Sequence, residues 1–555
     1  MIHITMEGKT VSFAAPISLK KALGKLARDT ASNILACFHK GSVLELNTLL
    51  DRSGELIPIT YQNEEGRRIY ERSLRFVFLL AVQRCFPYGN ARMEHSIGQG
   101  IYIELNQMRL SSSDALAIEA AMHDIVKEDL PFARKRWTKQ QAIDYFMENG
   151  DEDKAQLLGY RPYDYFDVYI CGGMAEYFYG AMLPSTSYVP VFKLHPRSPG
   201  LILLLPDKSN PAQPAPYLSA PKHMATFAQS NYWCKVLGCS TAAQLNGLIA
   251  HGGLRDFIRV NEAFHDKSLS EIAQDIINRG ARAIFIAGPT SSGKTTFANR
   301  LSIHLRVNGL RPVILSMDDF YIDRRHLPLE ADGKPDLEAI SALDIDYFRI
   351  CLHQLLNSQE ALMPRFSFTS GAREPKLVAT RIDNTQPVII EGIHSLNPAL
   401  HAGIEPTLLC RIYISQLTAL NLDNHNRIRT TDVRLLRRIV RDYLFRDTKP
   451  EETLEMWDSV RRGEEKWIFP YQEQADIVFN SALHYELPVL KVLAYDMLRQ
   501  VPRTHPDYIK CSRIIKILHY FLPVSETIMD EIPPLSILRE FIGGNTLYLH
   551  PEHLI

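Results

Sequence analysis

The stretch "GPTSSGKTTF", Gly288 to Phe297, decides the fold of the second half of this 555-residue chain. It fits the pattern G-x-x-x-x-G-K-[ST], and Gly288, Gly293, Lys294 and Thr295 occupy the fixed positions. Glycines let a backbone wrap until its N–H groups point at phosphate oxygens, and the lysine neutralises the β- and γ-phosphates of a nucleotide. An apolar strand pattern, "RAIFIA", precedes the motif and a helical pattern follows it, as this chemistry requires. The sequence therefore predicts a nucleotide site.

The phosphate loop is expected to bind ATP, although a preference for ATP over GTP is not encoded in the motif. The hydroxyl of Thr295 is expected to ligate Mg²⁺. The predicted nucleotide-binding residues are Gly288, Pro289, Thr290, Ser291, Ser292, Gly293, Lys294, Thr295 and Thr296.

Composition excludes several classes of protein. With 46% hydrophobic and 23% charged residues, the chain is typical of a globular protein. Its net charge of −1 gives it no overall electrostatic attraction to nucleic acid or to an anionic membrane. Its longest aliphatic run, "LILLLP", is too short for a bilayer span, and its first residues lack the apolar core of a signal peptide. The eight cysteines form no CxxC pair, which argues against a disulfide framework or a zinc ribbon. We expect a cytoplasmic protein with reduced thiols and no membrane partner.

The length suggests about three domains. Residues 1–60 are typical of short strands around one helix, and 61–205 mix helix and strand patterns. Residues 206–275 are expected to be a linker and a helix, because 206–221 hold five prolines without apolar periodicity. Strands alternate with helices over 276–490, the signature of a parallel α/β sheet, and 491–555 are expected to form a helical extension.

Acidic and basic residues that suit phosphoryl transfer follow the loop in order. Asp318 and Asp319 end one buried strand pattern and Glu391 ends a second, at the carboxyl edge where open α/β sheets keep their active sites. The segment "RIRTTDVRLLRRIVRDYLFRDTKP" is rich in arginine, and helical spacing places Arg434, Arg438 and Arg441 on one face. Each feature also has a simpler explanation. The aspartates could cap a helix and the glutamate could belong to a turn. The arginines could form a solvated helix face or an RNA-binding patch.

Residues 283 to about 485 resemble the uridine kinase and phosphoribulokinase family of kinases. "DDFY" is similar to that family's "DSFY", and "IIEGIH" to its "FEGI" strand. "KPDLEAISALD" resembles a ribose-binding segment, and "TTDVRLLRRIVRD" the lid sequence "DTDVRLIRRIRRD". The tail segment "IPPLSILREFIGG" is typical of a long bacterial branch of the family and carries no predicted chemical role.

The resemblance implies a role for each matching residue. It implies that Asp318 takes the proton of the sugar 5′-hydroxyl, with Lys294 and Arg441 as its catalytic partners, and that Glu391 is linked to Mg²⁺. Arg446 would face the ATP phosphates. The implied residues of the acceptor pocket are Tyr321, Asp336, Phe366, Arg438 and Arg441, and among these Asp336 would hold the ribose hydroxyls.

One departure concerns the base of the nucleoside. The family reads a pyrimidine in a segment like "YDFVSHSR", with an aromatic residue and a histidine, whereas this chain has "FSFTSGAR". Phe366 keeps the ring, but Gly371 stands in place of the histidine. A stacking surface discriminates less than a hydrogen bond, so the base preference is not predicted.

The N-terminal region resembles part of threonyl-tRNA synthetase. Residues 1–60 are similar to its ubiquitin-like β-grasp domain and 61–205 to its α+β editing domain. The editing site uses an HxxxH pair and a later Cys and His, but Arg72 and Phe76 stand at the first two positions and only Cys171 remains. We therefore expect no zinc and no ester hydrolysis, and Cys171 to be a buried thiol. RNA or tRNA, a regulatory ligand and the kinase domain itself all remain open as partners of this region.

The sequence thus predicts an ATP- and Mg²⁺-dependent, uridine kinase-like nucleoside kinase. A kinase of another small hydroxyl compound, such as a sugar phosphate or pantothenate, is the first alternative, and an RNA-associated protein that uses ATP as a switch is the second. A homo-oligomer is also left open.

Overall fold

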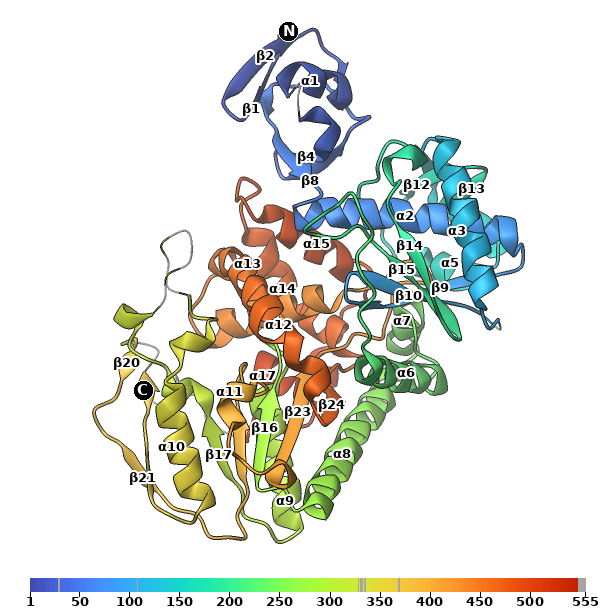
Figure 1. The fold of residues 1–555 in the computed structure, drawn as a ribbon. Coiled ribbons are helices and arrows are strands. Elements are labelled where there is room, and N and C mark those ends of the chain that lie inside the picture. The colour runs from blue at the N-terminus through green and yellow to red at the C-terminus, as the bar shows by residue number, and fades with distance from the viewer. Residues whose placement is uncertain are drawn as a thin grey trace.

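The structure is a computed structural model, and it describes residues 1–27, 30–106, 108–327, 329, 333, 336–367 and 370–547. A five-stranded, wholly parallel sheet forms the centre of the C-terminal half (Figure 1). Its strand order is β17 (Val313–Ser316), β22 (Val388–Glu391), β16 (Ala283–Ala287), β23 (Leu409–Ser415) and β24 (Ile477–Asn480). The predicted α/β class is confirmed. β16 and β22 are buried along their whole length, as expected of parallel strands covered on both faces.

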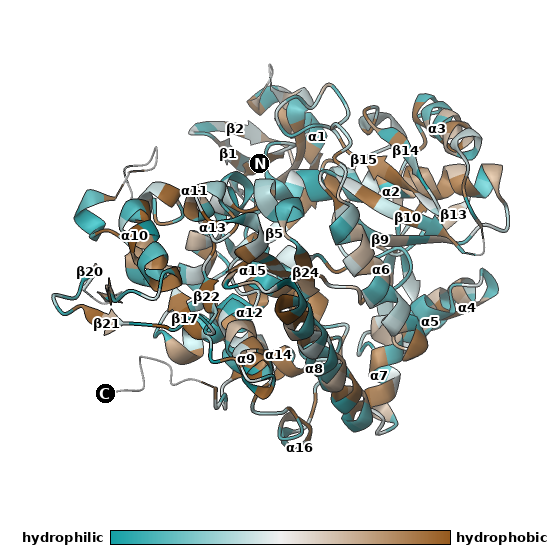
Figure 2. Cartoon of the chain, turned by 60° about the horizontal axis from the view of Figure 1, so that its bottom comes forward, coloured by the Kyte–Doolittle hydropathy of each residue, from teal (hydrophilic) through white to brown (hydrophobic). Residues whose placement is uncertain are grey.

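Helices pack around this sheet. Figure 2 colours α8 partly teal and partly brown, as expected of a helix with one buried and one solvated face. The helices are α8 (Leu254–Arg279), α9 (Lys294–Val307), α10 (Ile345–Leu356), α11 (Pro398–His401), α12 (Thr430–Phe445), α13 (Pro450–Trp467) and α14 (Glu486–Gln500). Two small antiparallel pairs lie beside the sheet: β18 (Ala361–Met363) with β21 (Val378–Thr380), and β19 (Phe366–Ser367) with β20 (Ala372–Arg373).

The first 60 residues form a small unit at one end of the molecule, beyond α2 (Figure 1). Its core is built by strands around one helix, as the sequence predicted. The elements are β1 (Ile2–Met6), β2 (Lys9–Phe13), β3 (Ile17–Ser18), α1 (Leu19–Leu26), β4 (Ile34–His39), β5 (Ser42–Glu45), β6 (Leu49–Leu50), β7 (Gly54–Glu55) and β8 (Ile57–Thr60).

Residues 61–205 form a mixed region with two antiparallel sheets, in the orders β14-β15-β10-β9 and β11-β12-β13. Its elements are α2 (Glu64–Cys85), β9 (Ala91–Ile97), β10 (Gly100–Leu105), α3 (Ser112–Lys127), β11 (Ala133–Thr138), α4 (Lys139–Glu148), α5 (Glu152–Gly159), β12 (Tyr165–Cys171), β13 (Met174–Glu176), β14 (Lys193–Arg197) and β15 (Gly200–Leu204). The small antiparallel sheets agree with the expected synthetase-like architecture.

The connection holds more helices than the sequence suggested, and the tail is helical. Residues 206–275 hold α6 (Pro221–Val236), α7 (Ala242–Ala250) and most of α8, so only 206–220 runs as a connecting segment. The tail forms α15 (Tyr508–Leu518), α16 (Glu526–Met529) and α17 (Arg539–Ile542). One continuous core includes Phe146 of the middle region, Ile284 of the sheet and Leu538 of the tail. The regions are therefore packed together.

Within the described residues, no helix is both long and apolar enough to cross a membrane. All eight cysteines are unpaired thiols.

Candidate active site

The phosphate loop joins the end of β16 to the start of α9, as predicted. Ser291 and Gly293 adopt positive φ angles of 60° and 87°, which turn the backbone back on itself before the helix begins. A Cβ atom at Gly288 would run into the carbonyl oxygen of Ile414 on the neighbouring strand, so only glycine fits there. The buried hydroxyls of Ser291 and Ser292 have no hydrogen-bond partner among the described groups. The loop thus presents polar groups suited to an anion at the N-terminus of α9.

Lys294 begins α9 and points back across the loop, where its Nζ donates to the carbonyl oxygen of Pro289 at 3.3 Å. Burial lowers the pKa of this ammonium, and the nearby carboxylates of Glu391 and Asp318 oppose that effect. Lys294 and these two predicted carboxylates therefore share one electrostatic environment.

The carboxylates come from two adjacent parallel strands. Glu391 ends β22, and Asp318 lies in the short turn Met317–Phe320 after β17, whose last residue Ser316 pairs with Glu391 in register. The Ser316 hydroxyl donates to Glu391 Oε1 at 3.1 Å and accepts from the Asp318 backbone N–H at 3.3 Å. Burial, and next the Asp318 charge, raise the pKa of Glu391 to about 7, and burial also raises the pKa of Asp318. Two poorly solvated carboxylates so close together favour a proton or a cation between them.

A third carboxylate, Glu338, was not predicted. The predicted ribose ligand Asp336 accepts a hydrogen bond from the Glu338 backbone N–H at 3.1 Å, and so fixes this segment. The Oε2 of Glu338 is shielded from solvent and has no hydrogen-bond partner among the described groups. Burial raises the pKa of Glu338 to about 7; the Arg438 charge opposes the shift, and Lys294 and Asp318 are also within electrostatic range. Both acidic residues lie within electrostatic range of Tyr321, and Glu338 also lies within range of Lys294 and Asp318.

Two groups of arginines from the arginine-rich segment lie along α12 and at its C-terminal end. Arg434 and Arg437 are fully buried and hold the loop from behind: Arg434 Nε donates to the Thr290 carbonyl at 2.9 Å, and Arg437 Nη1 to the Ser291 carbonyl at 3.4 Å. Each also pairs with a buried glutamate, Arg434 with Glu464 and Arg437 with Glu486. These two arginines are structural supports of the phosphate loop.

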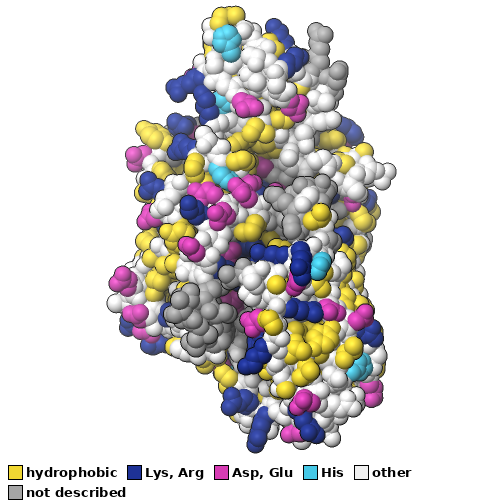
Figure 3. Space-filling model, turned by 90° about the vertical axis from the view of Figure 1, so that its left-hand side faces the viewer, with side chains coloured by type: hydrophobic (Ala, Val, Ile, Leu, Met, Phe, Trp, Pro, Cys, Tyr) yellow, Lys and Arg dark blue, Asp and Glu magenta, His cyan; other side chains and the backbone are white. Residues whose placement is uncertain are grey.

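The predicted lid arginines form the second group, around Asp442. Arg438, Arg441 and Arg446 have nitrogen atoms 3.1, 3.1 and 3.6 Å from its carboxylate. Their charges hold the pKa of Asp442 below its usual range although burial acts the other way. Arg446 also lies near enough to Asp318 to oppose the burial-driven rise in its pKa. Figure 3 shows Lys and Arg side chains gathered near the middle of the face that carries α10, interleaved with acidic ones.

The two predicted aromatic residues of the acceptor pocket come together. The rings of Tyr321 and Phe366 are 5.7 Å apart between centroids, and the Phe366 backbone N–H donates to Asp319 Oδ1 at 3.3 Å. Gly371 has a φ of 67°, and a Cβ there would run into the Arg324 side chain. The arginine thus packs where a side chain at position 371 would begin. Residues 368 and 369 of this segment lie outside the described residues.

The tail contacts the phosphate loop, which sequence reasoning missed. Thr296 Oγ1 donates to Glu540 Oε2 of α17 at 2.7 Å, and Arg441 Nη1 lies 3.8 Å from Glu540 Oε1. The Ile537 side chain packs so closely on Gly293 that a Cβ there would clash with it. The predicted nucleotide residue Thr296 is therefore buried against the tail, whereas Thr295 is only half-buried.

At the positions that correspond in sequence to the editing site, the N-terminal region does not hold that site's set of histidine and cysteine side chains. Cys171 is buried, and burial raises the pKa of its thiol to about 12. Asp151, Glu176 and His425 form a separate group of ligand-type side chains, but Lys154 occupies its centre. The Lys154 ammonium pairs with Glu176, lies 3.6 Å from Asp151 and is 3.0 Å from His425 Nδ1. A lysine ammonium thus already lies among these side chains.

Comparisons with known proteins also separate the C-terminal part of the chain from the N-terminal part. Residues 283–487 match the model of the phosphoribulokinase / uridine kinase family. The N-terminal part is similar to threonine–tRNA ligases, at 31% identity over 196 residues for that of Nitratidesulfovibrio vulgaris and 27% over 197 residues for that of Symbiobacterium thermophilum. Each alignment covers 35% of this chain, and the chain spans about 30% of the length of these curated relatives.

A solved structure described as a possible uridine kinase from Bacillus stearothermophilus is 18% identical, with a TM-score of 0.26, and the alignment covers 41% of this chain and 99% of that chain. The family match and the phosphate loop coincide in the sequence. The chain thus contains a C-terminal domain of the phosphoribulokinase / uridine kinase family behind a region distantly similar to threonine–tRNA ligases.

Proposed function

We propose that this chain is an ATP- and Mg²⁺-dependent nucleoside kinase that transfers the γ-phosphoryl group to the 5′-hydroxyl of a nucleoside. The observation that carries the proposal is the convergence of Lys294, Asp318 and Glu391 beside the phosphate loop, at the carboxyl edge of two adjacent parallel strands. A phosphoryl-transfer site needs this combination of a phosphate cradle, a cation and acceptor-side carboxylates.

Asp318 is the proposed base. A carboxylate whose pKa is raised by poor solvation accepts a hydroxyl proton more readily than a solvated one. Lys294 neutralises charge on the phosphates, and the cluster of Arg438, Arg441 and Arg446 closes over them and excludes water, because ATP hydrolysis is the competing reaction.

The donor set suits a divalent cation. The Thr295 hydroxyl and the Glu391 carboxylate would hold Mg²⁺, and the raised pKa of Glu391 shows that its environment already disfavours an uncompensated negative charge. Mg²⁺ supplies charge neutralisation for the transferring phosphoryl group when bound.

Glu338, positioned by Asp336, is the proposed ribose ligand. A carboxylate that accepts hydrogen bonds from two neighbouring hydroxyls recognises a vicinal diol, and the unpartnered Oε2 of Glu338 is available for this. Tyr321 and Phe366 would line the base pocket.

A panel of acceptors tests the proposal. The full-length protein is incubated with ATP, Mg²⁺ and, separately, uridine, cytidine, adenosine, ribulose 5-phosphate, pantothenate and tRNA. ADP and the phosphorylated product are measured by mass spectrometry. A nucleoside monophosphate supports the proposal, whereas a phosphorylated sugar phosphate or pantothenate alone, or ATP turnover stimulated only by tRNA, would replace it with one of the two alternatives.

A further inference from the structure

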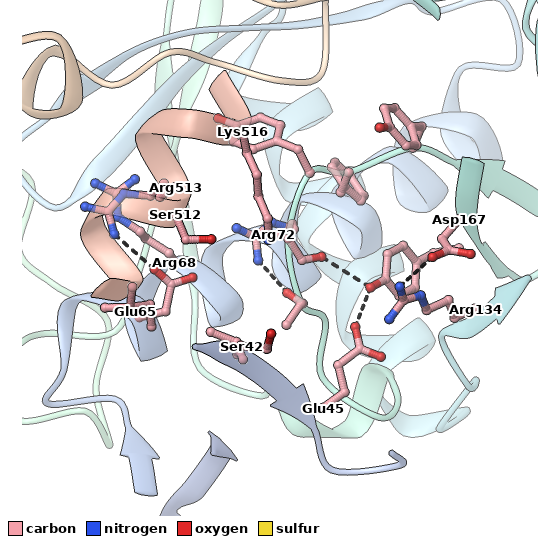
Figure 4. Close-up of a pocket in the computed structure, with 18 of the residues that line it drawn as sticks. Ser42, Glu45, Glu65, Arg68, Arg72, Arg134, Asp167, Ser512, Arg513 and Lys516 are labelled. Carbon is pink, nitrogen blue, oxygen red and sulfur yellow. Dashed lines mark hydrogen bonds and ion pairs between the residues drawn. The ribbon is translucent and has the colours of Figure 1, made fainter. Parts of the chain in front are cut away.

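A second, separate cavity lies between the N-terminal unit, the middle region and the tail (Figure 4). Its volume is about 610 Å³, in the range that holds a nucleotide-sized ligand. β5 contributes Ser42 and Glu45, α2 contributes Arg68 and Arg72, and α15 contributes Lys516. We call it the inter-domain cavity.

The lining of the inter-domain cavity is strongly cationic. Nine arginine and lysine side chains line it, against four carboxylates. Most of the carboxylates are committed to ion pairs: Glu71 to Arg429, Glu65 to Arg513 and Asp167 to Arg134. The cavity therefore carries excess positive charge.

Three of the cations have no carboxylate partner among the ion pairs of the described residues: Arg72, Arg161 and Lys516. Arg72 is only 6% exposed and donates to the Ala181 carbonyl. Arg161 donates to the Tyr177 hydroxyl at 2.8 Å and lies over the Tyr520 ring. Burial lowers the pKa of Lys516, the nearby Arg72 charge lowers it further, and the Glu65 charge opposes this shift. Cations that are not paired with a carboxylate are a natural complement of an anion.

Aromatic side chains make up much of the remaining lining. Nine tyrosine and phenylalanine side chains contribute to it, and Tyr163 and Tyr165 remain 40% and 60% exposed. Aromatic faces beside arginines are the surface on which nucleic-acid bases stack. A ligand that matches both features carries a phosphate and a planar base.

We infer that the inter-domain cavity binds a nucleotide phosphate, with the anion between Arg72, Arg161 and Lys516 and the base against the tyrosines. The ligand is either a free nucleotide or the end of an RNA strand, which share this chemistry. The inference does not depend on the proposed kinase activity, because it uses residues remote in sequence from the phosphate loop.

Calorimetric titration of the full-length chain carrying Lys294→Ala tests this, since that change weakens nucleotide binding at the phosphate loop. The probes are UTP, ATP, inorganic tripolyphosphate, a short single-stranded RNA, and uridine as the ligand without phosphate. We expect a phosphate-bearing probe to bind and uridine not to. Adding Lys516→Gln or Arg72→Gln should weaken that binding about ten-fold or more. Lys267→Gln, which removes an exposed lysine on α8, is the matched control and should change nothing.

Binding of UTP or ATP identifies a free nucleotide as the source, and binding of RNA alone identifies a strand end; both support the inference. It is overturned if uridine binds as well as UTP, if no probe binds, or if Lys516→Gln has the same affinity as the Lys267→Gln control. The Lys516 side chain makes no hydrogen bond or ion pair among the described residues, so this variant decides even where Arg72→Gln fails to fold.

Discussion

In the kinase site, burial raises the pKa of Glu391 and Glu338 to about 7, whereas beside the inter-domain cavity the arginines hold the pKa of Glu71 at about 2. All three are glutamates shielded from water, and the difference lies in their partners. Glu71 is surrounded by Arg75, Arg427 and Arg429, while Glu391 faces another carboxylate and one lysine.

The comparison separates two uses of buried charge. Excess carboxylate suits a site that receives a metal ion and a substrate hydroxyl, and so performs acid–base chemistry. Excess cation, with most of the nearby carboxylates already in ion pairs, suits a site that holds an anion without transforming it. We therefore expect the two sites to respond in opposite ways to the same kinds of substitution.

The largest loss of activity is expected from a change of Lys294, the lysine that lies among the carboxylates. Lys294→Ala should reduce phosphoryl transfer by about a thousand-fold or more, because it removes the cation that neutralises the phosphates. The steady-state rate of product formation measures this, with Lys267→Ala as the control. Transfer at the wild-type rate would exclude Lys294 from the site.

Asp318→Asn should lower turnover by about 10²- to 10⁴-fold, the usual contribution of a positioned base, and should leave ATP binding intact. Single-turnover kinetics combined with ATP titration separate the two quantities. Unchanged turnover would remove Asp318 from its role as base, and lost ATP binding would assign it to the nucleotide instead.

Breaking the ion pairs beside the inter-domain cavity should destabilise the fold. Glu71→Gln leaves buried arginines without their counter-charge, at a cost of about 3–5 kcal/mol in the free energy of unfolding. Because the folded-state pKa of Glu71 is depressed, the stabilisation is present above its unfolded value near 4.5 and is lost as pH falls toward 2. Urea unfolding at pH 7 measures the cost, and a wild-type value would show that these pairs carry no net stability.

The corresponding change of a glutamate to glutamine in the kinase site should alter the stability of the fold in the opposite direction. The raised pKa of Glu391 means that its protonated form stabilises the fold below about 4.5 and that this stability is lost as pH rises through about 7. Glu391→Gln should therefore stabilise the metal-free protein at pH 8 by about 1–3 kcal/mol. Thermal unfolding at pH 5 and pH 8 tests this, with the exposed Glu360→Gln as the control. A lower Tm at pH 8 would contradict the charge imbalance.

Two neighbouring carboxylates sharpen the assignment of the ribose ligand. Glu338→Gln should raise the KM for the nucleoside about 10- to 100-fold, with a smaller change in kcat, because a charge-assisted hydrogen bond is weakened. Asp336→Asn should have a lesser effect, since among the described residues its carboxylate accepts only a backbone hydrogen bond. If Asp336→Asn raises KM more than Glu338→Gln does, the original sequence-based assignment is the better one.

The sequence was most informative where backbone geometry dictates residue type. The glycines, lysine and flanking strand of 288–297 predicted the loop and the parallel sheet, because few other residues permit that turn. Helical spacing grouped Arg434 with Arg438 and Arg441, but it could not show that Arg434 is paired with a glutamate 30 residues away. Glu338 and Glu540 were missed for the same reason: their positions depend on how distant segments pack.

The most direct measurement follows the transferred phosphoryl group itself. The full-length protein is given γ-³²P-labelled ATP, Mg²⁺ and either uridine or 5′-deoxyuridine, and the labelled product is separated and its phosphate position assigned. We predict labelled nucleoside 5′-monophosphate from uridine and no labelled nucleoside from 5′-deoxyuridine. Label on 5′-deoxyuridine would contradict the acceptor atom, and label released only as inorganic phosphate, with uridine and with every other nucleoside of the panel, would contradict the assignment of this site as a nucleoside kinase.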